Sequence, residues 1–223
     1  MNRKLGIYAS VAIVLLMGAV AAWAWPETPA DTPIAVHWSA TGAPNGYASK
    51  FWALLGLPLL AAAVAAILAL VPSLEPRARN LAMSGRAYVI GWIGGLALIA
   101  VAYMALVLNA TGHQVRIQVV VPVTVGALLV VIGNYLGKTR SNFFFGVRTP
   151  WTLSSELSWA KTHRLAGRLF VLCGLLIVVV ALVAPGPTTA VVIGMAITSM
   201  VVIPVLYSYL VWRTDPAKQP VGR

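Results

Sequence analysis

Charged side chains are scarce in this sequence. Only 9% of its 223 residues are Asp, Glu, Lys or Arg, whereas 60% are hydrophobic. A soluble domain carries about 25% charged residues, and a chain this apolar cannot cover its surface with polar groups in water. The composition therefore excludes an ordinary soluble protein and indicates a membrane protein.

Two further scarcities narrow the class of protein. Cys173 is the single cysteine, so an internal disulfide is excluded, and its apolar neighbours favour a packed core residue. Ionisable residues are missing from the middle of every long apolar run. Because transporters usually place such residues in mid-membrane, transport is only an alternative interpretation. The motifs of zinc proteases, serine hydrolases and phosphate loops are missing too.

Six apolar stretches are each about as long as a helix that crosses the hydrocarbon core. None alternates polar and apolar residues as a barrel strand would. The sequence thus predicts an all-α membrane protein with a six-helix transmembrane bundle. The first stretch resembles a secretory signal, but its apolar run is longer than a signal's, which favours a retained anchor. The stretches are Leu5–Trp25, Phe51–Val71, Ala87–Leu108, Ile117–Leu136, Leu165–Ala184 and Ala190–Trp212.

The Lys and Arg residues are unevenly divided between the two ends of these predicted helices. Lys50 and Arg116 lie in the connections on one side, and the other fourteen lie on the opposite side. Since cytoplasmic loops collect positive charge, both termini are predicted to face the cytoplasm (N-in/C-in). Anionic lipid headgroups are then the expected partners of this charge, and no direct nucleic-acid binding is predicted.

The first outer loop, residues 26–50, is predicted to be ordered. Alternation over Ile34–Trp38 indicates one short extended segment, and Gly42 with Pro44–Gly46 indicates a tight turn after it. Asp31, His37 and His113 share the outer side, but they lack a recognised ligand spacing and no metal site is predicted. The candidate ligand contacts of this loop are His37, Trp38, Asn45, Tyr47 and Lys50.

The second long connection, with the residues that follow it, is the polar segment 137–168 on the cytoplasmic side. Its aromatic residues argue against disorder, and the proline after Thr149 favours an extended start. A helix capped by Thr152 or Ser154, with Glu156 in its first turn, is predicted to lie at the interface and to continue into the fifth span. One face of this helix holds Glu156, Trp159, Ala160, His163 and Gly167, and a neighbouring face holds Lys161, Arg164 and Arg168.

This segment resembles the signature of the SdpI family of bacterial membrane proteins. Ser141 departs from the pattern, because a proline is expected there. The stretch "TPIAVHWSATGAPNGYASKF" likewise resembles a small domain of unknown function that accompanies the family. The matching signature residues are Asn134, Gly137, Lys138, Asn142, Gly146, Arg148, Thr149, Pro150, Trp151, Thr152, Leu153, Ser154, Trp159, Thr162, His163, Arg164 and Gly167.

The resemblance implies an immunity protein of the bacterial cytoplasmic (inner) membrane. Such a protein resists a secreted membrane-active toxin and captures a cytoplasmic repressor, and no cofactor is implied. The implied division is an N-terminal unit at 1–72, a third helix with connectors at 73–116, an SdpI-like region at 117–212 and a tail at 213–223. An enzyme acting on a lipid or phosphate headgroup through Glu156 and His163 is the alternative. The candidate residues of the cytoplasmic segment are Asn134, Lys138, Asn142, Arg148, Thr149, Trp151, Glu156, Trp159, Lys161, Thr162, His163 and Arg164.

Overall fold

A computed structural model describes residues 2–219. Six of its helices are long and apolar enough to cross a membrane, so the six predicted spans are confirmed. The helices are α1 (Arg3–Glu27), α2 (Lys50–Leu74), α3 (Ala78–Met83), α4 (Gly85–Ala110), α5 (Ile117–Leu136), α6 (Pro150–Leu153), α7 (Glu156–Val183) and α8 (Pro187–Thr214). The strands are β1 (Ile34–Trp38) and β2 (Pro44–Ala48).

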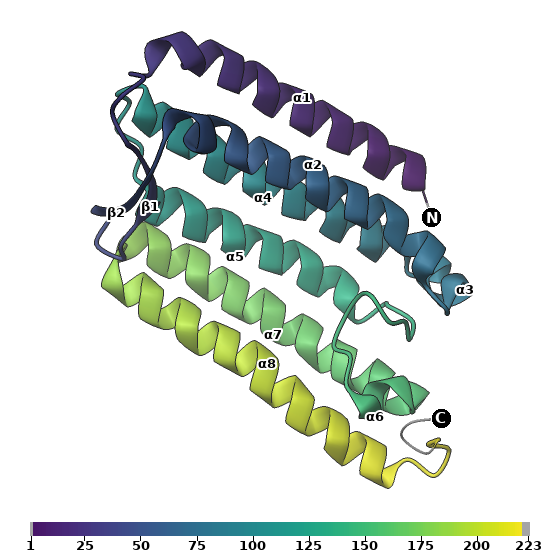
Figure 1. Cartoon of the computed structure of the whole chain (residues 1–223). Helices are drawn as coiled ribbons and strands as arrows, with labels where there is room; N and C mark the ends of the chain where they lie inside the picture. Colours follow the sequence, from purple (N-terminus) through teal and green to yellow (C-terminus); the bar gives the residue numbers. More distant parts are fainter. Residues whose placement is uncertain (1, 220–223) are drawn as a thin grey trace.

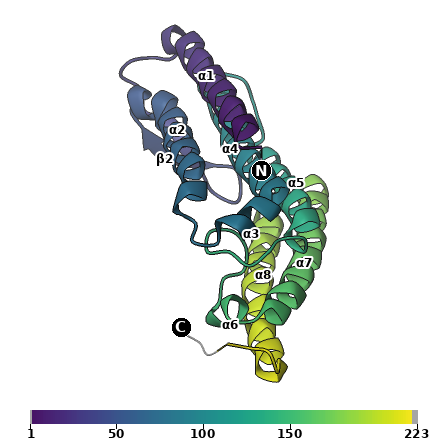
Figure 2. The same cartoon turned by 90° about the vertical axis from the view of Figure 1, so that its right-hand side faces the viewer.

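The long helices lie side by side in two groups (Figure 1). Helices α1, α2 and α4 pack on one another around the larger hydrophobic core, and α7 packs between α5 and α8. Contact between α4 and α5 joins the groups. Figure 2 shows the two groups edge-on, with α1 and α2 on one side and α5, α7 and α8 on the other.

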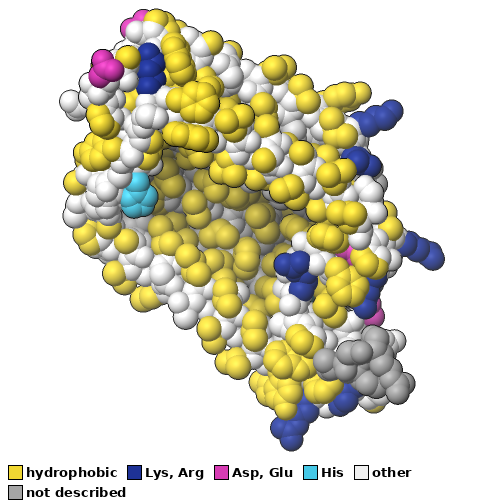
Figure 3. Space-filling model, viewed as in Figure 1, with side chains coloured by type: hydrophobic (Ala, Val, Ile, Leu, Met, Phe, Trp, Pro, Cys, Tyr) yellow, Lys and Arg dark blue, Asp and Glu magenta, His cyan; other side chains and the backbone are white. Residues whose placement is uncertain are grey.

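The two ends of the bundle differ in structure and charge. The hairpin end carries β1 and β2, and the loop end carries α3, α6, the 137–155 connection and the described parts of both termini (Figure 1). Hydrophobic side chains cover the face between the ends, and Lys and Arg gather at the loop end (Figure 3). Leu15, Leu172 and Leu206 are each more than 60% exposed. Such an apolar outer surface suits lipid rather than water.

Helices α5 and α7 approach each other unusually closely, because both carry glycine where they cross. A Cβ atom on Gly133 would lie 2.7 Å from the carbonyl oxygen of Gly167, and one on Gly126 would lie 2.6 Å from that of Gly174. Small residues at such crossings let two helix backbones pack directly in a membrane. The α5–α7 contact holds the two sides of the 137–155 connection together.

The outer loop contains more regular structure than predicted. Pro44–Ala48, part of which was expected to form a turn, is a second strand that pairs antiparallel with Ile34–Trp38. The turn lies earlier, where the Ser39 amide donates to Ala43 and the Gly42 amide donates to Ser39. The register of the two strands is irregular, with shifts between Ala35 and His37 and between His37 and Trp38.

The predicted interfacial helix is divided in two. Thr149 caps the short helix α6, and α7 begins at Glu156 after Ser155, whose side chain accepts from the Ser158 amide. Neither Thr152 nor Ser154 is the cap of α7. Glu156 lies in the first turn as predicted, and α7 continues without a break into the fifth span.

Candidate functional site

The 137–155 connection folds into a compact cap on the loop end, and Asn142 organises its centre. The Asn142 side chain is fully buried. Its Oδ1 accepts from the amides of Phe144 and Phe145 at 3.0 and 2.7 Å, and its Nδ2 donates to the carbonyl of Arg140 at 2.8 Å. The amide thus satisfies the backbone of a tight turn that has no other secondary structure.

A stacked Trp–His pair on α7 holds the next part of the cap. The rings of Trp159 and His163 lie 3.9 Å apart, and both side chains are buried. Trp159 Nε1 donates to the carbonyl of Thr139, and His163 Nε2 accepts from the amide of Val147, both at 2.9 Å. Because Nε2 accepts, His163 Nδ1 carries the proton and donates to the Trp159 carbonyl, so the ring is neutral.

Gly146 is required where the cap crosses this ring. Its φ is +111°, a conformation that residues with a side chain rarely adopt. A Cβ atom at this position would also lie 2.3 Å from His163 Nε2. The glycine therefore allows the backbone to pass close enough for Val147 to bind the imidazole.

Hydroxyl groups attach α6 and the start of α7 to α8. Thr149 Oγ1 lies 3.1 Å from Ser208 Oγ, and Ser158 Oγ donates to the carbonyl of Ser208 at 2.8 Å. Ser155 Oγ donates to the Asp215 carboxylate at the end of α8. This hydrogen bond and that from the Ala217 amide hold the pKa of Asp215 below its ordinary value.

The segment between α2 and α4 supplies contacts that the sequence analysis did not identify. Glu75 is buried, and its carboxylate accepts from the amides of Phe143 and Arg77 at 2.9 and 2.8 Å. The Arg77 guanidinium donates to Ser141 Oγ and to the carbonyl of Leu153 and lies over the Phe143 ring. The signal available in the sequence was Glu75 itself, one of only five acidic residues.

The candidate residues predicted for the cytoplasmic segment divide into a buried set and an exposed set. Thr162 belongs to the buried set, and its hydroxyl has no hydrogen-bond partner among residues 2–219. Trp151 is half-buried with its ring edge on Tyr209. The buried set is Asn142, Thr149, Trp159, Thr162 and His163, and the exposed set is Asn134, Lys138, Arg148, Glu156, Lys161 and Arg164.

The structure does not bring Glu156 and His163 together. They lie on the same helix at a separation of seven residues, but Glu156 is exposed whereas His163 is fully buried with both ring nitrogens bonded. The predicted helix face is therefore exposed to solvent at Glu156 and buried under the cap at His163. A proton relay between these two side chains has no support in the geometry.

The predicted ligand contacts of the outer loop also divide into exposed residues and residues that pack against the bundle. His37, Asn45 and Tyr47 are exposed, and His37 Nδ1 lies 2.6 Å from Asn45 Oδ1. Trp38 packs on the core of α1, α2 and α4. Lys50 donates to the carbonyl of Thr28 at 2.7 Å and lies 5.0 Å from the Trp25 ring centroid, so it anchors the loop.

The hairpin turn rests on the second helical group. Gly42 lies against the side chain of Gln118 at the start of α5, and the Ala40 carbonyl lies beside Gly186 between α7 and α8. Trp38 and Pro122 line a shallow pocket at this contact. The hairpin turn thus contacts the helices that carry the cap at their other end.

Comparison with known protein families finds one match in each half of the chain. Residues 138–208, which include most of the cap, match the model of the SdpI/YfhL protein family. Residues 12–62, which include the hairpin, match a domain of unknown function (DUF1648). No solved structure matches the chain significantly.

A curated relative extends the SdpI likeness. The "Immunity protein SdpI" of Bacillus subtilis (strain 168) is 33% identical over 86 residues, which cover 39% of this chain and 42% of the relative. The match therefore spans less than half the length of that relative. The six apolar helices and the similarity to SdpI indicate a multi-pass membrane protein.

Proposed function

We propose that this chain is an immunity protein of a bacterial cytoplasmic membrane, which protects the cell from a membrane-active peptide toxin. The similarity to the SdpI immunity protein over 86 residues carries this proposal. The bundle is oriented with its basic loop end in the cytoplasm and its hairpin end outside. The cap of SdpI-family residues is then a rigid inner-leaflet scaffold.

The hairpin is the proposed contact for the toxin. His37, Asn45 and Tyr47 form an exposed polar and aromatic set at the outer end, and Tyr47 is 60% exposed. A toxin bound here would also press on the turn that rests on α5 and on the α7–α8 connection. Such a ligand can shift the bundle only if it binds one arrangement more tightly than another.

The test is growth protection in a toxin-sensitive host. Cells expressing the chain are challenged with a panel of membrane-permeabilising peptides, and the inhibitory concentration of each peptide is compared with that for an empty vector. We expect a rise for at least one peptide and its loss in the His37→Ala, Asn45→Ala, Tyr47→Ala triple variant. His113→Ala, on the neighbouring outer loop, is the matched control and should protect fully.

Unchanged sensitivity across the panel, with membrane insertion verified, would contradict immunity. Protection that survives the triple variant would move the toxin contact away from the hairpin. Equal loss in the triple variant and in His113→Ala would indicate a general defect of the outer loops rather than a contact.

A second candidate function is capture of a cytoplasmic repressor at the loop end. Phe143 and Phe144 are each about 40% exposed there beside Arg148, and exposed aromatics with arginine are typical of protein contacts. A fluorescent fusion of a regulator encoded next to this chain should move to the membrane when the toxin is present. Phe143→Ser with Phe144→Ser should prevent the movement, and a regulator that never leaves the cytosol would contradict capture.

A further inference from the structure

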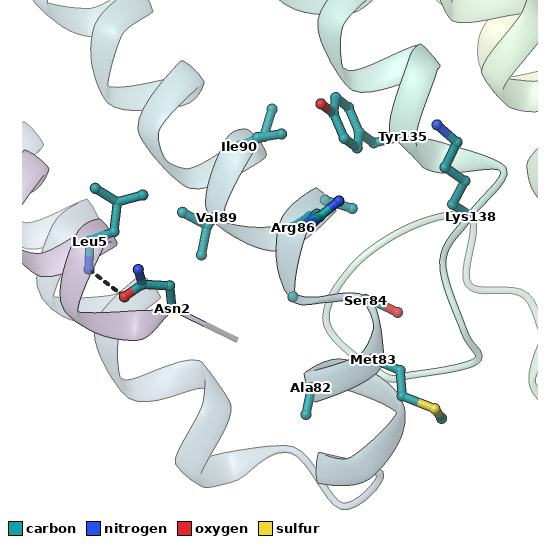
Figure 4. A pocket seen from close by; sticks show the side chains of 12 residues that line it. Asn2, Leu5, Ala82, Met83, Ser84, Arg86, Val89, Ile90, Tyr135 and Lys138 are labelled. Atoms are coloured by element: carbon teal, nitrogen blue, oxygen red, sulfur yellow. Dashed lines mark hydrogen bonds between the residues drawn. The ribbon is translucent and has the colours of Figure 1, made fainter.

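A cavity of about 740 Å³ opens at the loop end, where α1 begins, α3 meets α4 and α5 ends (Figure 4). It lies at the junction of the two helical groups, because α1 and α4 belong to one and α5 belongs to the other. Its lining comes from α1, α3, α4 and α5 and from Lys138, the first residue that matches the SdpI/YfhL family model.

Cations line this cavity and no carboxylate does. Arg86 reaches it from the first turn of α4, and Lys138 reaches it from the end of α5 (Figure 4). Both side chains are exposed, and Lys138 Nζ lies 5.3 Å from the Tyr135 ring centroid. Neither cation pairs with a carboxylate within residues 2–219, and two such cations at one opening favour an anion between them.

The start of α4 also favours binding of an anion in the cavity. Ser84 precedes the helix, but its side chain does not cap it, because its hydroxyl donates to Asn80 and accepts from the Arg140 amide. The amide groups and the positive dipole end of this 26-residue helix therefore lie at the cavity without a side-chain acceptor. A phosphate oxygen is a suitable acceptor for them.

The other side of the cavity is apolar. Leu5, Val89 and Ile90 line it, and Leu5 is 50% exposed on the outside of α1. In Figure 4 these three side chains lie together, separate from Lys138. A small soluble anion would leave this surface in contact with water, whereas an acyl chain would cover it.

We propose that the cavity binds one anionic phospholipid. Its phosphate lies between Arg86 and Lys138 at the start of α4, and an acyl chain lies along Leu5 and Ile90. The lipid fills the junction between the α1–α2–α4 group and the α5–α7–α8 group. This assigns a role to Lys138, a signature residue whose ammonium lies over the Tyr135 ring and donates no hydrogen bond to residues 2–219.

The test is native mass spectrometry of the full chain in a neutral detergent. The probes are phosphatidylglycerol and phosphatidylcholine with identical acyl chains, and soluble glycerol 1-phosphate as a headgroup without chains. We expect one phosphatidylglycerol to be retained in preference to phosphatidylcholine, with no competition from equimolar glycerol 1-phosphate. The Arg86→Gln, Lys138→Gln variant should lose affinity by roughly fivefold for each cation removed.

The matched control is Arg79→Gln with Lys161→Gln, which removes two exposed cations from the same end but outside the cavity. It should bind as the wild type does. Should the cavity double variant fail to fold by circular dichroism, Ala82→Glu places a carboxylate at an exposed lining position and should weaken binding equally. Equal loss in both double variants, or no preference for phosphatidylglycerol, would overturn the proposal. Full competition by glycerol 1-phosphate would overturn the phospholipid in favour of a free phosphate ester.

Discussion

The contact between Gly146 and His163 shows how single residues fix the cap. A neutral imidazole, buried and stacked on Trp159, accepts from a backbone amide that only a glycine turn brings close. Loss of the imidazole would leave the Val147 amide without this acceptor, and an unpaired polar group of this kind costs about 1–3 kcal/mol when buried. These contacts therefore hold the cap together.

The first prediction separates backbone strain from crowding at Gly146. Gly146→Ala should lower the free energy of unfolding through both effects. Gly112→Ala is the matched control, because Gly112 has a φ of +88° with nothing within 4 Å of a Cβ. We expect about 1–3 kcal/mol from strain in each variant and about 1–3 kcal/mol more in Gly146→Ala. Detergent denaturation monitored by circular dichroism measures both, and equal losses would contradict the contact with His163.

The second prediction concerns Asp215, which fastens the end of α8 to the cap of α7. Its pKa lies below the ordinary value of 3.8, because the Ser155 hydroxyl and the Ala217 amide donate to the carboxylate. The folded state thus stabilises the charged Asp215 carboxylate relative to the unfolded state. The stabilisation is complete above pH 3.8 and is lost as the pH falls below that value.

Asp215→Asn should therefore melt at a lower temperature than the wild type at pH 7. The difference should shrink as the pH falls below 3.8, because the carboxyl of the unfolded state then takes up a proton while the folded state still holds it charged. Melting temperatures of both proteins between pH 7 and pH 3 test this. Asp31→Asn, at an exposed outer-loop position, is the control for the substitution itself and should melt as the wild type does at pH 7. A gap between wild type and Asp215→Asn that stays constant with pH would exclude the Ser155 contact as its source.

At the scale of the helices, the α5–α7 contact determines where the cap can form. Direct backbone packing at Gly126–Gly174 and Gly133–Gly167 brings the end of α5 beside the start of the membrane part of α7. The connection between them then folds back over both helices. The predicted interfacial helix is replaced by α6 and the capped start of α7, because Thr149 and Ser155 each close a separate helix with their side chains.

The third prediction tests this contact. Gly133→Ala and Gly167→Ala each place a methyl group 2.7 Å from a carbonyl oxygen of the opposite helix. The helices must separate, and we expect each variant to lose about 1–3 kcal/mol of stability in detergent denaturation. Gly194→Ala on α8 meets nothing within 4 Å and should be neutral or slightly stabilising. Wild-type stability in both crossing variants would show that the backbones are not in contact.

At the scale of the molecule, the two candidate contact surfaces lie at opposite ends of the bundle. His37 belongs to the hairpin end, whereas Arg148 and His163 belong to the loop end with most of the basic residues (Figures 1 and 3). The hairpin nevertheless touches α5 and the α7–α8 connection. An outer ligand and an inner cap can therefore be coupled through the α5–α7–α8 group without any contact between them.

The fourth prediction is the orientation in the membrane. In a Cys173→Ala background, Tyr47→Cys and Lys161→Cys place single thiols at exposed positions of the two ends. A membrane-impermeant maleimide should label Tyr47→Cys in intact cells and Lys161→Cys only after permeabilisation. The reverse pattern would place the cap outside, and labelling of both in intact cells would contradict a closed bilayer between them.

The sequence by itself determined the six spans, the separation of charge between the ends and the segment that resembles the SdpI family. These features depend on composition and on the order of residues along the chain, because span length and loop charge are local properties. The signature spacing also identified Asn142, Thr149, Trp159 and His163, although it did not show that they are buried.

Only the tertiary structure decided which signature residues face inward, that Glu75 and Arg77 complete the cap, and that Arg86 shares a cavity with Lys138. Residues 75 and 143 are 68 positions apart, and no local period relates them. Their meeting depends on how α4 packs on α5 and α5 on α7, where contact distances of a few ångströms are set by glycines in one helix and side chains in another. The same packing buries His163 and leaves Glu156 of the same helix exposed to solvent.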